Sequence, residues 1–207
     1  KVIPLQDGGS LRIRGSVDRV DVLEQDGQQF VRVVDYKSGA KPFRLADIVN
    51  GLNLQMFLYL FNVCADGSNP YAGVPAGVLY MHAARSVMTV ETKSSAEKDI
   101  AGQEDKAFGM NGIVITNPDC DIPAAMEHDL AGKYIPVRLK KSGVGGSLAS
   151  LEQLGLLQRK IEALVADMGN ALQNGQIGQH PVQAKDHDKT CEYCDFASVC
   201  AFKKSVT

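Results

Sequence analysis

The sequence has no excess of charge of one sign and no membrane-length apolar run, and we expect no secretory leader. It carries 22 Lys and Arg against 24 Asp and Glu, a formal net charge of −2. The chain is therefore no polycation, so any nucleic-acid binding needs a local basic patch or a partner's surface. Its apolar runs fall well short of the roughly 20 residues of a transmembrane helix, and no basic segment followed by an apolar one opens the chain. It begins at Lys1 rather than a methionine, and we expect a piece of a longer protein.

The 207 residues are 44% hydrophobic and 22% charged, values typical of a globular chain with a buried core. The five cysteines are an odd number, and three of them, Cys191, Cys194 and Cys200, lie close together near the end. A disulfide framework normally shows paired cysteines in a small secreted chain. The sequence therefore favours a metal site in a reducing compartment, and we expect a cytoplasmic protein without a membrane partner.

Strand and helix signals alternate along the chain. Asp26-Gly27 separates two alternating runs and predicts a tight hairpin turn, while Ser150 and Gln153 form a capping box for a long helix. The alternation predicts an α/β fold with a mixed sheet flanked by helices. The predicted strands are Leu11–Arg14, Val17–Leu23, Phe30–Tyr36, Gly77–Ala83, Val87–Glu91, Gly112–Thr116 and Tyr134–Leu139; the predicted helices are Leu45–Cys64 and Ser150–Asn174, and Lys140–Ser147 is predicted to be a glycine-rich turn.

Two carboxylates and a lysine form the first candidate site. Asp35 and Lys37 are two residues apart on a predicted strand and therefore share one face. Asp18 lies at the start of the neighbouring strand, so its carboxylate can approach that of Asp35. Two close anions are costly unless a cation lies between them, and Mg²⁺ takes one or two carboxylates in this way. A metal ion with an adjacent ammonium group suits phosphodiester hydrolysis.

The simpler interpretation is an ordinary surface ion pair between Asp35 and Lys37. Buried charges are expensive, and the valines of this strand predict burial, which favours the functional interpretation. A third element is Gln55 with Tyr59, which are four residues apart and thus on one face of the predicted helix. An amide and a phenol there could hold a DNA backbone, or they could be the polar edge of a core helix.

Three segments of the sequence resemble the RecB-like branch of the PD-(D/E)xK nucleases, which have a restriction-endonuclease-like core. The segments are Gly15-Ser-Val-Asp18-Arg19-Val-Asp21, Val33-Val-Asp35-Tyr-Lys37-Ser-Gly39 and Gly51-Leu-Asn-Leu-Gln55-Met-Phe-Leu-Tyr59. The resemblance implies that Asp18 and Asp35 bind Mg²⁺ (or Mn²⁺), with the Tyr36 carbonyl as a third ligand. It implies Lys37 as the catalytic lysine, and Gln55 and Tyr59 as residues beside the scissile strand.

The second candidate site is the C-x-x-C-x-x-x-x-x-C cluster of Cys191, Cys194 and Cys200. Thiolates at this spacing can converge on one soft metal centre. His187 could complete a Cys₃His zinc site; alternatively, the three thiolates could hold a [4Fe–4S] cluster with a fourth cysteine from elsewhere. The other two cysteines, Cys64 and Cys120, stand alone in the sequence.

A RecB-like core followed by this cysteine cluster is similar to the C-terminal nuclease domains of AddB-type helicase–nuclease subunits. The resemblance implies a nuclease core over residues 1–145 and a C-terminal helix and cysteine region over residues 146–207 that packs on it, forming one domain. It implies a [4Fe–4S] cluster, an AddA-like partner subunit, and cleavage of single-stranded DNA at double-strand breaks in the bacterial cytoplasm. The alternative is a catalytically idle module that binds DNA ends or acts as a scaffold.

Overall fold

A mixed five-stranded sheet forms the centre of the molecule. The computed structural model describes residues 1–39, 42–83, 108–178, 181, 191 and 194–200. The strand order is β3-β4-β5-β6-β9, in which β3 pairs with β4 and β5 with β6 antiparallel, whereas β4 with β5 and β6 with β9 are parallel. The strands are β3 (Arg19–Gln25), β4 (Gln28–Lys37), β5 (Val74–His82), β6 (Asn111–Thr116) and β9 (Leu148–Ser150). The predicted α/β class with a central mixed sheet is confirmed.

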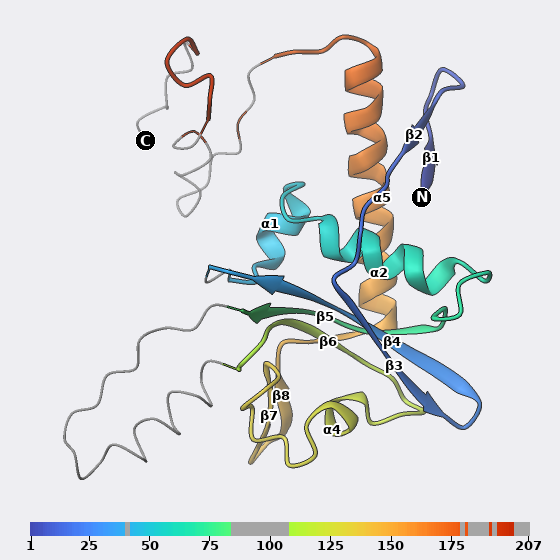
Figure 1. Cartoon of the computed structure of the whole chain (residues 1–207), viewed down its shortest axis with the longest axis vertical. Coiled ribbons are helices and arrows are strands. Elements are labelled where there is room, and N and C mark those ends of the chain that lie inside the picture. Colours follow the sequence, from blue (N-terminus) through green and yellow to red (C-terminus); the bar gives the residue numbers. More distant parts are fainter. Residues whose placement is uncertain (40–41, 84–107, 179–180, 182–190, 192–193, 201–207) are drawn as a thin grey trace, which may run out of the picture.

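Helices cover both faces of this sheet (Figure 1). One face packs against α1 (Leu45–Val49), α2 (Gln55–Ala65) and α5 (Leu151–Gln173), and the other lies over the short helix α4 (Ile122–Met126). The alternation of side chains along β4 separates the two cores, since Val33 belongs to the α2 face and Val34 to the α4 face. In the described part of the chain, none of the helices has the length and hydropathy needed to span a bilayer.

Two local predictions are confirmed. The β3–β4 hairpin turns at Asp26 and Gly27, whose φ angles of 51° and 77° place both in the left-handed region that such tight turns require. The long helix α5 begins with the predicted capping box, in which the Ser150 hydroxyl accepts from the Gln153 amide while the Gln153 side chain accepts from Ser150 N–H.

The predicted single helix over Leu45–Cys64 is wrong, because the segment forms two helices, α1 and α2. Gly51 and Asn53 between them have φ angles of 81° and 56°, which a right-handed helix cannot accommodate. The Asp47 carboxylate accepts a hydrogen bond from Asn53 Nδ2 at 3.0 Å and fixes this turn. Helix α2 consequently starts at Gln55 and has a direction of its own.

The structure also differs from the prediction around the sheet edges. The strand Val87–Glu91, predicted to pair with the Gly77–Ala83 strand, lies outside the described residues; the antiparallel partner of β5 is β6. Residues Lys140–Ser147 are more than a turn, since β7 (Val137–Lys140) and β8 (Gly143–Gly146) form a hairpin there. A further hairpin of β1 (Val2–Pro4) and β2 (Ser10–Arg12) packs along α5.

Candidate active site

Asp35 and Lys37 lie on the α2 face at the carboxyl end of β4. Asp35 is buried, with 5% of its surface exposed, and its Oδ2 atom lies 2.6 Å from Lys37 Nζ. The Oδ2 atom is buried and accepts no hydrogen bond, so the adjacent ammonium group is what balances its charge. The ion pair of the simpler interpretation is thus present, but its carboxylate is buried rather than at the surface.

Asp18 contacts the same end of β4 from the segment that precedes β3. The β3–β4 ladder finishes at the pair Arg19 and Val34, and Asp18 is the residue just before β3. Its Oδ2 atom accepts a hydrogen bond from Tyr36 N–H at 3.1 Å. The Asp18 carboxylate thus binds the main chain between Asp35 and Lys37, and the three predicted residues come together at one end of the hairpin.

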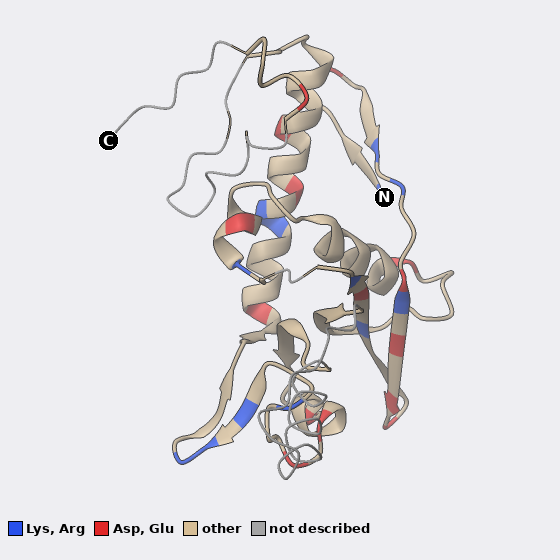
Figure 2. Cartoon of the chain, turned by 60° about the vertical axis from the view of Figure 1, so that its left-hand side comes forward, with Lys and Arg blue, Asp and Glu red and all other residues tan. Residues whose placement is uncertain are grey.

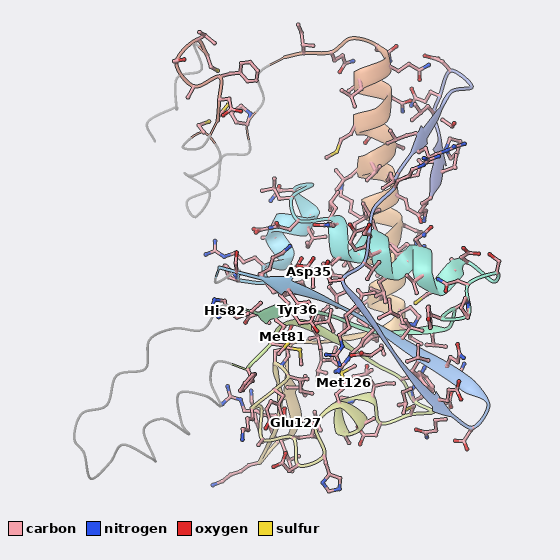
Figure 3. All side chains as sticks on the ribbon, in the orientation of Figure 1. Asp35, Tyr36, Met81, His82, Met126 and Glu127 are labelled. Carbon is pink, nitrogen blue, oxygen red and sulfur yellow. The ribbon has the colours of Figure 1, made fainter. Side chains whose placement is uncertain are left out.

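The parallel neighbour β5 supplies the other wall of this region. Asp35 pairs with Tyr80, and Tyr36 with Met81, and Figure 3 shows Asp35 and Tyr36 beside Met81 and His82 where the two strands end. Burial, and secondarily the negative charge of Asp35, raises the pKa of Tyr80 to about 12. Sequence reasoning missed Tyr80, because no local signal reveals which residue of a parallel strand will lie beside Asp35.

Gln55 and Tyr59 lie one turn apart at the start of α2 and contact each other. Gln55 Nε2 donates to the Tyr59 hydroxyl at 2.8 Å. The Tyr59 ring lies against Gly15, where a Cβ atom would come within 2.6 Å of the ring. Helix α2 therefore places this pair against the segment that leads to Asp18, and Tyr59 is held from both sides.

The donor set at this strand end suits a hard divalent cation. It offers two carboxylates next to the Tyr36 main chain: Asp35, which is buried against the Lys37 ammonium group, and Asp18, which is exposed and accessible to water. Mg²⁺ commonly uses one or two carboxylates and keeps several waters. Over the described residues there is no group of three or more His, Cys, Asp or Glu side chains that could hold a metal ion, so a site here depends on main-chain and water oxygens.

The described cysteines do not form a closed metal site. Cys194 is exposed, and Cys191 and Cys200 are half-buried, all three as free thiols. The Cys194 and Cys200 amides donate to the carbonyls of Cys191 and Phe196 at 3.4 and 2.9 Å, so this stretch is a series of turns. His187, the candidate zinc ligand, lies outside the described residues. The thiol chemistry suits a soft metal centre, but the observed arrangement does not bring the three together around one.

Figure 2 shows acidic and basic positions on several helices and strands, but the β7–β8 hairpin carries basic residues alone. Arg138, Lys140 and Lys141 lie on that hairpin and its turn. The near-neutral net charge gives no general attraction for a polyanion, so recognition of one would have to come from local groups of side chains.

Comparison with known proteins agrees with this geometry. The PD-(D/E)XK nuclease superfamily profile matches residues 2–201. The chain is 32% identical over 210 residues to an ATP-dependent helicase/deoxyribonuclease subunit of Ruminiclostridium cellulolyticum, a match covering 99% of this chain and 18% of that protein. It is 29% identical over 212 residues to the subunit of the same name from Listeria monocytogenes (99% of this chain, 18% of the relative) and 34% identical over 207 residues to that from Oceanobacillus iheyensis (96% and 17%).

The chain thus spans less than a fifth of the length of these relatives. The match covers all three segments that carry the resemblance to nucleases, and it confirms that resemblance and the restriction-endonuclease-like core. One assignment follows from three findings: a mixed sheet with flanking helices, an acidic pair with a lysine at one strand end, and a profile match over nearly the whole sequence. The chain belongs to the PD-(D/E)XK nuclease superfamily.

Proposed function

We propose that this chain is the deoxyribonuclease domain of an AddAB-type helicase–nuclease, and that it hydrolyses phosphodiester bonds of single-stranded DNA. The observation that carries the proposal is the buried Asp35 carboxylate in contact with Lys37, next to the Tyr36 amide that binds Asp18. A buried ion pair of this kind is weak evidence for a structural role, because the cost of removing both charges from water can exceed the attraction between them. Its chemistry, in contrast, suits the nuclease family to which the chain belongs.

Asp18, Asp35 and the Tyr36 carbonyl would hold Mg²⁺ or Mn²⁺. When bound, such an ion polarises the phosphate and lowers the pKa of a water molecule. Lys37 carries a positive charge that can stabilise the charge developing on the phosphate oxygens. Its side chain is 29% exposed while its ammonium group contacts Asp35, so the charge is within reach of a substrate at the surface. Gln55 and Tyr59 would contact the sugar–phosphate backbone next to the scissile bond.

The cysteine cluster has a separate role in this proposal. Cys191, Cys194 and Cys200 would provide three thiolates to a [4Fe–4S] cluster, with a fourth ligand from another part of the protein, and zinc is the alternative metal. Residues 1–145 would form the nuclease core and residues 146–207 a C-terminal region that packs on it. By its relation to the helicase/deoxyribonuclease subunits, the chain would act in the bacterial cytoplasm, with an AddA-like partner, on DNA ends.

Cleavage of an end-labelled single-stranded oligonucleotide with Mg²⁺ or Mn²⁺ tests the proposal. Asp35→Ala and Lys37→Ala should each reduce the rate by roughly 10²-fold or more, as expected for loss of a group that stabilises developing charge. Glu24→Gln is the matched control, since Glu24 is an exposed β3 carboxylate near the turn of the same hairpin, where it accepts a hydrogen bond from Gln29 Nε2. Binding of DNA ends without metal-dependent cleavage would support the idle scaffold instead.

A further inference from the structure

The opposite face of the β3–β4 hairpin carries a continuous chain of polar contacts directly behind the candidate active site. Arg32 Nε donates to Asp21 Oδ2 at 2.8 Å, and Arg19 Nε donates to Asp21 Oδ1 at 2.7 Å. Arg19 Nη1 in turn donates to the Tyr36 hydroxyl at 3.3 Å. Register explains the alignment, because Asp21 pairs with Arg32 and Arg19 with Val34, so all these side chains project to the α4 face.

This series of polar contacts begins within the β3–β4 ladder, at Asp21 and Arg32, and ends beyond it, at Tyr36. The last β3–β4 backbone pair is Arg19 with Val34, so Tyr36 has no β3 residue opposite it. On its other side β4 stays paired with β5, where Tyr36 pairs with Met81, but towards β3 only side chains hold this part of the hairpin. The Asp18 carboxylate binds the Tyr36 amide on the main chain, and Arg19 binds the hydroxyl at the tip of the Tyr36 side chain.

We propose that Arg19, oriented by Asp21 and Arg32, is a positioning residue that fixes Tyr36 and thereby the main chain that meets Asp18. This inference rests on the proposed function, because it assigns Arg19 to the metal-binding strand end without direct contact with the metal or with DNA. Tyr36 is 40% exposed, so its side chain receives little support from packing, and a polar tether is what restricts its rotation.

The arginine is itself oriented by Asp21. Asp21 accepts from two guanidinium groups; although burial raises the pKa of this carboxyl, the hydrogen bonds from Arg19 and Arg32 outweigh it and leave the pKa below its ordinary value. Asp21 is therefore an anion throughout the neutral range. A guanidinium presents several donors in a rigid fork, so Arg19 can bind Asp21 through Nε and Tyr36 through Nη1 at the same time, which a lysine could not do with the same geometry.

Calorimetric titration of the chain with Mn²⁺ tests the positioning role without relying on cleavage. Arg19→Ala should raise the dissociation constant for Mn²⁺ about 10-fold, the lower end of the range for residues that orient metal ligands. Tyr36→Phe removes only the hydroxyl and leaves the main-chain amide and carbonyl in place, so it should weaken Mn²⁺ binding in the same direction in a chain that folds normally. Glu24→Gln, the control on the same strand, should stay within about twofold of the unchanged chain, as expected of a surface change far from the ligands.

A double variant distinguishes a tether from two independent effects. If Arg19 acts through Tyr36, Arg19→Ala with Tyr36→Phe should bind Mn²⁺ no more weakly than Arg19→Ala alone. An unchanged dissociation constant in folded Arg19→Ala, or multiplied effects in the double variant, would overturn the positioning role. Asp35→Asn separates the two proposals. If Asp35→Asn abolishes Mn²⁺ binding while Arg19→Ala leaves Mn²⁺ binding unchanged, only the positioning role fails. If Asp35→Asn binds Mn²⁺ normally, the metal site of the proposed function fails as well.

Discussion

Replacing Gly15 by alanine should push Tyr59 away from the segment that precedes Asp18. The added Cβ would lie 2.6 Å from both Cε1 and the hydroxyl oxygen of the Tyr59 ring and 3.0 Å from Cζ, distances too short for non-bonded atoms. The ring can yield only by moving, and this breaks the hydrogen bond from Gln55 Nε2 to the Tyr59 hydroxyl. Since the φ angle of Gly15 is not in the left-handed region, the whole penalty comes from this clash.

The size of the effect follows from two opposing terms. Overpacking of this kind costs about 1–3 kcal/mol, while replacing glycine by alanine stabilises a compatible site by about 0.4–1 kcal/mol through the unfolded chain. We therefore expect a net loss of about 1–2 kcal/mol, or a fall in Tm of roughly 2–8 °C for a chain of this length. Thermal and urea unfolding followed by circular dichroism measure it directly.

Two further variants make the test specific. Gly39→Ala is the matched control, because no heavy atom lies within 4 Å of its added Cβ, and it should be neutral or slightly stabilising. In a Tyr59→Ala background the clash no longer exists, so Gly15→Ala should cost almost nothing there. An equal loss of stability in the presence and absence of the Tyr59 ring would refute the proposed contact.

Three other predictions concern Glu127 and the thiols of Cys64 and Cys194. Glu127 is 5% exposed and accepts hydrogen bonds from the amides of Lys133, Tyr134 and Ile135 at 2.8–3.0 Å. Glu127→Ala should therefore lower the free energy of unfolding by about 2–3 kcal/mol. A loss under about 0.5 kcal/mol in urea unfolding would contradict this. Burial raises the pKa of Glu127, but these amides outweigh it and leave the pKa below its ordinary value. The stabilisation of the fold by the Glu127 carboxylate is therefore complete above the pKa of this group in the unfolded chain, and it is lost as the pH falls through the lower pKa of the folded state. Glu127→Gln should consequently lose less stability on acidification than the unchanged chain. Equal slopes of stability against pH in the two chains would contradict this. Cys64 is half-buried, and this burial raises the pKa of its thiol to about 12, whereas Cys194 is exposed. After chelator treatment, iodoacetamide at about pH 8 should therefore label Cys194 well before Cys64, as measured by mass spectrometry. Labelling at equal rates would contradict the partial burial of Cys64.

The sequence predicts those parts of the fold whose signals are local. The hairpin around Asp26 and Gly27 depends on two adjacent residues that tolerate positive φ, and α5 depends on a capping box and a sustained apolar stripe. The break between α1 and α2 could not be predicted from periodicity, because the apolar spacing continues through Leu52. The break depends on the positive φ angles of Gly51 and Asn53, which the apolar pattern does not reveal.

In the candidate site, too, the features with local signals could be predicted and the contacts between distant segments could not. Asp35 and Lys37 share a face because strand geometry requires it, and the hairpin prediction brings Asp18 close to them. The neighbours supplied by distant segments could not be predicted, since Tyr80 reaches Asp35 through parallel pairing of β5, and Gly15 reaches Tyr59 through packing of α2. The contact from Arg19 to Tyr36 also depends on where the β3–β4 ladder ends, which is a property of the folded sheet.

The most direct test of the account is a crystal structure of this chain soaked in Mn²⁺, with the ion located by its anomalous scattering. We expect one Mn²⁺ bound by carboxylate oxygens of both Asp18 and Asp35, with the Tyr36 carbonyl as a further ligand and Lys37 adjacent. An ion bound elsewhere, or no ion at this strand end at a concentration that saturates cleavage, would contradict the central claim.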